Sequence, residues 1–285
     1  MKTFFFILFQ YLVPQHLLSR LALFIAENRQ PWFKNRLIAW FIKKYDVDMS
    51  IAAEPDATTY KHFNDFFTRP LAEGARVIDT NESIIISPAD GCISQLGAIK
   101  QGRIFQAKGQ EYSLLELVGG NTDIAKPFQN GHFATVYLSP KDYHRVHSPM
   151  AGKLTSMIHV PGDLFSVNDT TAENVPRLFA RNERVVCVFE TEKGSMAVVL
   201  VGAMIVASIE TPWAGLVTPV KKQVRQWDYQ HSTDNDLVFA KGDEIGRFKL
   251  GSTAIVLMDE HFDQWEESLG AQSPVKMGEN IGRLR

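Results

Sequence analysis

From residue 83 onward the chain contains a series of short β-branched and apolar runs, which most strongly limit its possible folds. Each run ends at or near Gly, Pro, Asn or Asp, the residues that terminate strands and form turns. The runs are SIIIS (83–87), FATVYLS (133–139), SMIHVPG (156–162), RVVCVFET (184–191), MAVVLVGAMIVASIET (196–211) and STAIVLM (252–258). This spacing predicts a β-rich body of the barrel or sandwich kind.

The first 50 residues have a different pattern, which predicts amphipathic helices. In residues 15–29 and 31–45, apolar and aromatic side chains recur at helical spacing, with basic residues between them. The apolar run after Lys2 is broken by Gln10 and is shorter than the roughly 20 residues that span a bilayer. We therefore expect an α+β protein, with a helical segment (1–50) before a β-rich domain (51–285).

Charge is unevenly distributed between these two parts. Residues 1–45 carry seven Lys and Arg against Glu27 alone, a formal charge of +6. The remaining residues carry 23 basic and 31 acidic side chains, a formal charge of −8. A basic, aromatic-rich segment on an acidic body favours an anionic lipid surface over nucleic acid as its partner. The alternative is a helical hairpin that packs on its own domain or on a partner subunit.

Cysteine and histidine usage argues against two other kinds of site. Cys92 and Cys187 are the only cysteines and lie far apart, so a disulfide framework or a structural zinc site is not expected. His144 and His147 are three residues apart, but two ligands without a third nearby are few for a metal. We therefore expect no metal and a reducing compartment.

Three segments hold candidate catalytic residues. Asp90 follows the strand-like run at 83–87, His147 lies in a dense polar cluster with His144, and Ser252 follows Gly251 within a strand-like segment. Individually, Asp-Gly indicates a turn, and Gly-Ser within a strand indicates a bulge. Asp90, His147 and Ser252 together supply the parts of an Asp-His-Ser triad, which geometry and not chain order defines. No G-x-S-x-G surrounds Ser252, so a lipase-type nucleophile elbow is not supported.

Seven segments, taken in order, carry a resemblance that covers essentially the whole chain from about residue 10 to 280. They are FNDFFTRPL (63–71), SPADG (87–91), YHRVHSP (143–149), VPGDLFSVN (160–168), LFARNERV (178–185), VGAMIVASIET (201–211) and GRFKLGST (246–253). In these segments the chain resembles the bacterial, membrane-associated phosphatidylserine decarboxylases. LGST after a Lys, preceded by GRF, is the most specific of these segments.

The resemblance implies a proenzyme that cleaves itself between Gly251 and Ser252. Ser252 would attack the Gly251 carbonyl, with His147 as the base and Asp90 holding the His147 tautomer. Elimination and hydrolysis would then convert Ser252 into an N-terminal pyruvoyl group. The products would be chains 1–251 and 252–285, which remain packed as a heterodimer. Thr253 either donates a hydrogen bond near the oxyanion or only packs.

The resemblance also implies the mature reaction. The pyruvoyl group would form a Schiff base with phosphatidylserine, release carbon dioxide and yield phosphatidylethanolamine. His144 is the expected proton donor to the substrate carbon, with His147 as the second choice. Ser166 and Asn168 are expected to position the substrate.

The resemblance further implies a peripheral protein on the cytoplasmic face of the bacterial inner membrane, and a homodimer. Two other functions remain open from the residues themselves. One is a membrane-associated serine esterase or lipase that uses Ser252, His147 and Asp90 without self-cleavage. The other is a non-enzymatic peripheral lipid-binding protein.

Overall fold

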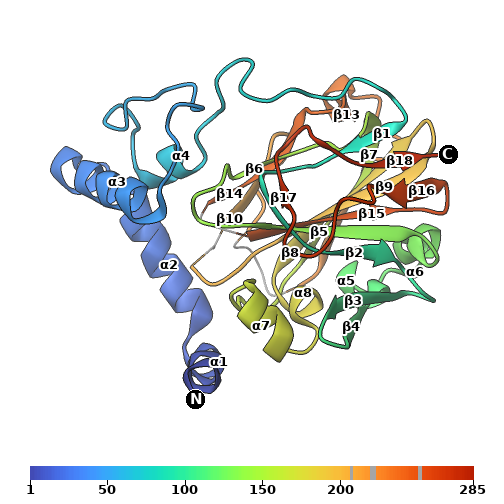
Figure 1. Cartoon of the computed structure of the whole chain (residues 1–285), viewed down its shortest axis with the longest axis horizontal. Coiled ribbons are helices and arrows are strands. Elements are labelled where there is room, and N and C mark those ends of the chain that lie inside the picture. The colour runs from blue at the N-terminus through green and yellow to red at the C-terminus, as the bar shows by residue number, and fades with distance from the viewer. Residues whose placement is uncertain (206–207, 219–222, 250–251) are drawn as a thin grey trace.

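The computed structural model describes residues 1–205, 208–218, 223–249 and 252–285. Three consecutive helices begin the chain: α1 (Lys2–Leu12), α2 (Gln15–Ala26) and α3 (Pro31–Tyr45). Pro31 occupies the first turn of α3, where its missing N–H removes no helical hydrogen bond. In Figure 1 these helices form an arm at one side of the strand-rich body. The predicted helices are confirmed, although the second ends at Ala26 and not at residue 29.

An aromatic cluster joins this arm to the short helix α4 (Phe63–Phe67). The Phe41 ring of α3 lies 5.0 Å from the Phe63 ring, and Phe66 is completely buried beside them. Burying one such ring stabilises the fold by roughly 1.5–3 kcal/mol. Within the part of the chain that the structure describes, no helix is both long and apolar enough to cross a membrane.

The largest sheet among the described residues has nine strands, all paired antiparallel. Eight of them follow one another as β12 (Arg225–Asp228), β7 (Gly152–Val160), β8 (Arg184–Thr191), β9 (Gly194–Val201), β15 (Ser252–Met258), β5 (His132–Leu138), β2 (Gly91–Ala98) and β17 (Pro274–Val275). The ninth, β13 (Val238–Phe239), also pairs with β7. The expected α+β class is confirmed.

Smaller elements surround this sheet. Their strands are β11 (Gly215–Leu216), β10 (Ser208–Thr211), β14 (Glu244–Lys249) and β6 (Arg145–His147) in one sheet, β1 (Ile84–Ile86), β18 (Asn280–Leu284) and β16 (Phe262–Trp265) in another, and the hairpin β3 (Arg103–Ala107) and β4 (Gln110–Ser113). Their helices are α5 (Leu114–Leu117), α6 (Thr122–Ala125), η1 (Lys126–Phe128), α7 (Asp169–Asn174), α8 (Leu178–Arg181) and η2 (Asn235–Leu237).

Strand β15 lies near the middle of the large sheet, between β5 and β9. All seven of its residues are buried, which is the outcome expected for a short continuous apolar run. It pairs with β5 from Ser252 to Met258 and with β9 from Thr253 to Met258. Strand β15 is therefore held on both edges by backbone hydrogen bonds and on both faces by packing.

Candidate active site

Ser252 is the first residue of β15 and lies opposite Leu138, the last residue of β5. Its side chain is buried, yet its Oγ has no hydrogen-bond partner among the described residues. The Oγ1 of Thr253 is also buried and also has no partner among the described residues. A buried hydroxyl without a partner costs about 1–3 kcal/mol, so two adjacent ones require an explanation. Gly251, the predicted acyl donor, lies outside the described residues.

His147 ends β6 and is almost completely buried. Its Nδ1 lies 2.7 Å from the carbonyl oxygen of Gly242, and its Nε2 lies 2.9 Å from the Tyr143 hydroxyl. Because a carbonyl only accepts hydrogen bonds, Nδ1 carries the proton in the neutral ring, and Nε2 accepts from Tyr143. Burial lowers the pKa of His147. The neutral ring therefore presents a basic Nε2.

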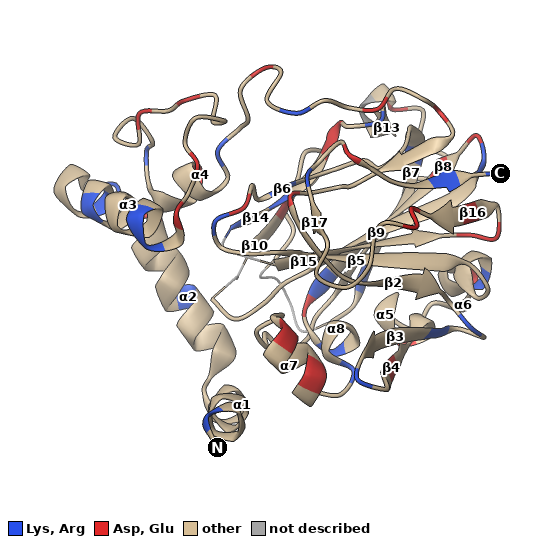
Figure 2. Ribbon diagram, viewed as in Figure 1, with Lys and Arg blue, Asp and Glu red and all other residues tan. Residues whose placement is uncertain are grey.

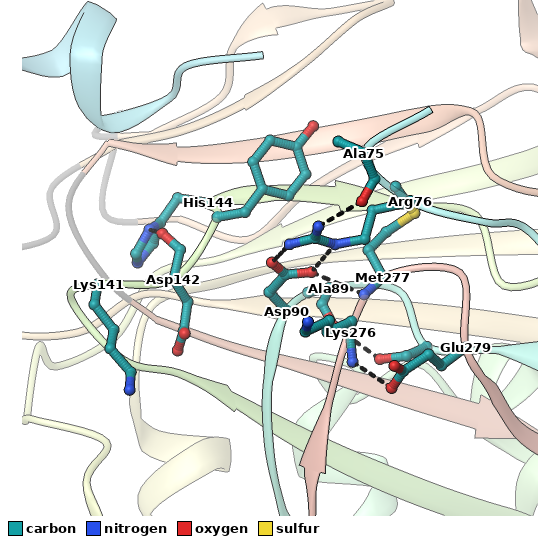
Figure 3. Close-up of polar contacts among 12 residues, drawn as sticks. Ala75, Arg76, Ala89, Asp90, Lys141, Asp142, His144, Lys276, Met277 and Glu279 are labelled. Atoms are coloured by element: carbon teal, nitrogen blue, oxygen red, sulfur yellow. Dashed lines mark hydrogen bonds and ion pairs between the residues drawn. The ribbon is translucent and has the colours of Figure 1, made fainter. Parts of the chain in front are cut away.

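Asp90 does not hold the His147 ring. Its carboxylate forms an ion pair with Arg76, whose Nε donates at 3.0 Å, and it accepts the backbone N–H of Met277 at 2.9 Å (Figure 3). The expectation that Asp90 fixes the tautomer of His147 is therefore wrong for this arrangement, because the Gly242 carbonyl occupies Nδ1. The two segments still meet, since His147 N donates to the carbonyl of Pro88 at 2.8 Å.

His144 is completely buried beneath an aromatic ring. The centroid of its imidazole lies 3.9 Å from that of Phe67, and its Nδ1 lies 2.8 Å from the backbone oxygen of Asp142. Burial is the main cause that lowers the pKa of His144, to about 3. Nδ1 therefore carries the proton of a neutral ring, and Nε2 has a lone pair with no partner among the described residues. In this state His144 can accept a proton but holds none at Nε2 to give.

Two backbone connections relate His144 to the strand that begins with Ser252. The segment that contains His144 follows directly after Leu138, which faces Ser252 in the sheet. In addition, the Phe248 N–H of β14 donates to the His144 carbonyl at 3.0 Å. His144 thus lies beside β14, which ends three residues before Ser252.

Between these two points, Asp142 fixes the turn that leads to His144. Its carboxylate accepts the N–H and the hydroxyl of Ser139, each at 2.7 Å. Burial raises the pKa of Asp142 despite these hydrogen bonds. In Figure 3, Asp142 and His144 lie to one side of the Asp90–Arg76 pair.

The predicted substrate-positioning residues lie in the loop before α7. The Asn168 Oδ1 accepts the Thr171 N–H at 3.0 Å and so caps that helix. The Ser166 N–H donates to Gln10 of α1 at 2.8 Å, and its side chain is half-buried. Their contact with a substrate therefore stays a prediction.

The structure adds residues that the sequence reasoning did not identify. Tyr143 and the Gly242 carbonyl contact both nitrogens of His147, and Arg76 neutralises Asp90. Tyr143 could have been suspected because it adjoins His144 in a polar cluster, whereas no local pattern marks Arg76 or Gly242. The described part of the chain has no cluster of three or more His, Cys, Asp or Glu arranged to hold a metal.

A buried serine without a partner in the ranges that the structure describes and two buried neutral histidines define a candidate site for nucleophilic and acid–base chemistry. The family described as phosphatidylserine decarboxylase matches residues 63–283, and a second family, described as PSD, matches residues 5–46. The chain therefore belongs to the phosphatidylserine decarboxylase family.

Curated relatives support this assignment over nearly the full length. A phosphatidylserine decarboxylase proenzyme of Ectopseudomonas mendocina (strain ymp) is 62% identical over 285 residues, covering 100% of both chains. Proenzymes of Pseudomonas entomophila (strain L48) and Pseudomonas fluorescens (strain Pf-5) are 62% and 61% identical, each covering 99% of this chain and 98% of the relative.

Proposed function

We propose that this chain is a proenzyme that cleaves itself between Gly251 and Ser252 and then decarboxylates phosphatidylserine to phosphatidylethanolamine. The observation that best supports it is the Oγ of Ser252, which is buried without a partner among the described residues at the first position of a strand held on both edges. An ordinary structural serine in such a place would have a hydrogen-bond partner. The family membership of the chain agrees with this chemistry.

Self-cleavage begins with attack of Ser252 Oγ on the Gly251 carbonyl carbon. Its proton passes toward Nε2 of His147, and the peptide nitrogen leaves protonated, which gives an ester. Elimination then removes the Cα proton of residue 252, breaks the Cβ–Oγ bond, releases the carboxylate of Gly251 and leaves dehydroalanine at residue 252. Addition of water and loss of ammonia turn dehydroalanine into a pyruvoyl group. The step requires Nε2 of His147 to exchange the Tyr143 hydroxyl for that of Ser252.

The residues around position 252 fit a pyruvoyl group. The side chain there is small and buried, and strands β5 and β9 hold the chain end that would carry the group. A pyruvoyl group supplies a ketone that takes up the substrate amine and accepts the electron pair left when carbon dioxide departs. After cleavage, the hydrogen bond from Met277 to Asp90 would also help keep fragment 252–285 on the larger one.

His144 is proposed to move the proton that ends on the substrate carbon. Because its Nε2 lone pair has no partner in the described part of the chain, His144 first takes a proton, for which the substrate ammonium is the natural source. It then returns the proton to the carbon that has lost carbon dioxide. Ser166 and Asn168 are proposed to hold the headgroup from the loop before α7.

The helical segment 1–50 is proposed to rest on an anionic lipid surface, the cytoplasmic face of the inner membrane. Large aromatic side chains of the arm are exposed to solvent: Phe4, Phe5, Phe9, Phe24, Trp32 and Trp40. Figure 2 shows Lys and Arg along α2 and α3 of the same arm. Exposed aromatic and basic side chains together favour a helix lying in the membrane interface. A homodimer stays a prediction.

The decisive experiment measures release of labelled carbon dioxide from carboxyl-labelled phosphatidylserine in vesicles. The unaltered protein should release it, Ser252→Ala should remain uncut and inactive, and His144→Ala should be cut but decarboxylate at least 100-fold more slowly, a typical loss for one acid–base group. An uncut chain that hydrolyses ester bonds instead would overturn the proposal in favour of the esterase.

A further inference from the structure

In helix α1, large apolar side chains face solvent and a polar side chain is buried, the opposite of the usual arrangement in a helix that packs on a protein. Its large apolar residues Phe4, Phe5 and Phe9 are more than half exposed, whereas Gln10 is completely buried. In Figure 1 the helix lies at the foot of the arm, next to α7, and the two are in contact. A glutamine is buried this completely only where its amide is hydrogen-bonded. Gln10 therefore indicates a specific attachment of α1 to the body.

The attachment is directed at the backbone of residues 162–168, hereafter the loop. Gln10 Oε1 accepts the Ser166 N–H at 2.8 Å, and its Nε2 donates to Thr171 Oγ1 at 3.3 Å. Gln15 of α2 repeats the pattern: its Oε1 accepts the Leu164 N–H at 2.6 Å, and its Nε2 donates to the Gln10 carbonyl at 2.8 Å. Two glutamines thus satisfy alternate N–H groups of one loop.

Aromatic contacts add to this polar attachment. The ring of Tyr11 lies 4.9 Å from that of Phe165, and the Arg181 guanidinium lies over both rings. Leu164 and Phe165 are buried, so their amide groups are shielded from water. Removing a glutamine would leave a shielded loop N–H without its partner, which destabilises this loop conformation. The loop conformation therefore depends on the seating of α1.

The other side of the loop is connected to the strand that carries Ser252. The buried Asn182 accepts the Phe165 N–H at 3.1 Å and donates to the carbonyls of Phe165 at 2.8 Å and Gly202 at 2.9 Å. Gly202 follows Val201, which pairs with Thr253 in the sheet. Hydrogen bonds and the backbone links between neighbouring residues thus connect Gln10, through the loop and Asn182, to the beginning of β15.

We propose that Gln10 and Gln15 are positioning residues that make the conformation of the loop depend on how α1 lies on a lipid bilayer. The exposed aromatic face of α1 would contact the bilayer, while Gln10, on the opposite side, holds the Ser166 N–H. Seating α1 on lipid would then order the loop that Asn182 and Gly202 connect to the beginning of β15. The functional consequence rests on the decarboxylase function proposed above.

The test compares Gln10→Met, which keeps the length of the side chain and removes both hydrogen bonds, with Gln10→Glu, which keeps the acceptor for Ser166. Hydrogen exchange of residues 162–168 is measured with and without phosphatidylglycerol vesicles that contain no substrate. In the unaltered protein, vesicles should slow exchange of the loop. Gln10→Met should exchange about tenfold faster and lose the vesicle effect, and Gln10→Glu should regain part of the protection.

Phe9→Ala provides the matched control, because Phe9 adjoins Gln10 and is exposed. It should weaken vesicle binding and leave loop exchange in solution unchanged. Gln10→Met should instead speed loop exchange in solution and leave vesicle binding unchanged. Gln10→Met should also self-cleave fully, which shows that it folds, and should have about tenfold lower kcat/KM on phosphatidylserine. Unchanged loop exchange in Gln10→Met, or no vesicle effect in the unaltered protein, would overturn the proposal. The exchange measurement tests the attachment of the loop to α1 whether or not the chain decarboxylates phosphatidylserine.

Discussion

The backbone N–H of Met277 donates a hydrogen bond to the carboxylate of Asp90 at 2.9 Å (Figure 3). The two residues lie on opposite sides of the proposed cleavage bond, so Asp90 joins the two fragments. Arg76 is on the same side of that bond as Asp90 and neutralises its charge. The ion pair therefore survives cleavage.

We predict that the two fragments stay together after self-cleavage. Strand β15 is completely buried between β5 and β9, and burying each of its large side chains contributes roughly 1.5–3 kcal/mol. Size-exclusion chromatography in native buffer should elute both fragments in one peak, and concentrated urea should separate them. Loss of the small fragment in native buffer would contradict this packing.

Asp90→Asn and Arg76→Gln should separate a catalytic role of Asp90 from a structural one. Each substitution breaks an ion pair whose side chains are only 9% exposed, so each should lower the free energy of unfolding by about 3–5 kcal/mol. Only Asp90→Asn also removes the negative charge near His147. That charge raises the pKa of His147 and so favours the protonated ring during catalysis. Asp90→Asn should therefore slow self-cleavage at least tenfold more than Arg76→Gln. Self-cleavage is followed on gels over time. If both variants slow it equally, Asp90 has only a structural role.

The pH dependence of self-cleavage should follow His147. Burial lowers the pKa of His147 below the 6.5 of a free histidine, and the reaction requires the neutral ring. The cleavage rate should therefore be constant above about pH 6.5 and fall only at more acidic pH. A rate that rises tenfold per pH unit above pH 7 would exclude His147 as the base.

The stability of the protein should decrease in acid because of His144. Its pKa is lowered to about 3 in the folded chain, whereas an unfolded chain binds this proton near pH 6.5. The unfolded state thus holds more protons between these values, and the free energy of unfolding falls as the pH is lowered through that range. Urea denaturation of Ser252→Ala at several pH values measures the slope, and His144→Gln in the same background should flatten it. An unchanged slope would contradict the burial of a neutral His144.

Ser252→Ala and Thr253→Val should differ in cleavage but not in stability. Both remove a buried hydroxyl that has no partner among the described residues, so the free energy of unfolding should rise by about 1–3 kcal/mol in each. Ser252→Ala should abolish cleavage. Thr253→Val should still cleave if Thr253 only packs, and cleavage slowed about 100-fold or more would assign its hydroxyl to the oxyanion.

Much of this architecture could be predicted from local sequence patterns. Helical spacing predicted α3, and the apolar residues after Ser252 predicted a buried strand, because both depend on neighbouring residues alone. The partners of His147 could not be predicted in this way. The carbonyl of Gly242 lies 95 residues from His147, and any residue type could supply it. Arg76 also reaches Asp90 only through tertiary folding, so the expected direct bond between Asp90 and His147 was wrong.

The most direct test of self-cleavage at Ser252 is the intact mass of the purified protein under denaturing conditions. We predict two species, residues 1–251 and residues 252–285, with a pyruvoyl group at the start of the smaller one and no free amine there for Edman sequencing. A single species with the mass of the uncut 285-residue chain, in a preparation that decarboxylates phosphatidylserine, would contradict it.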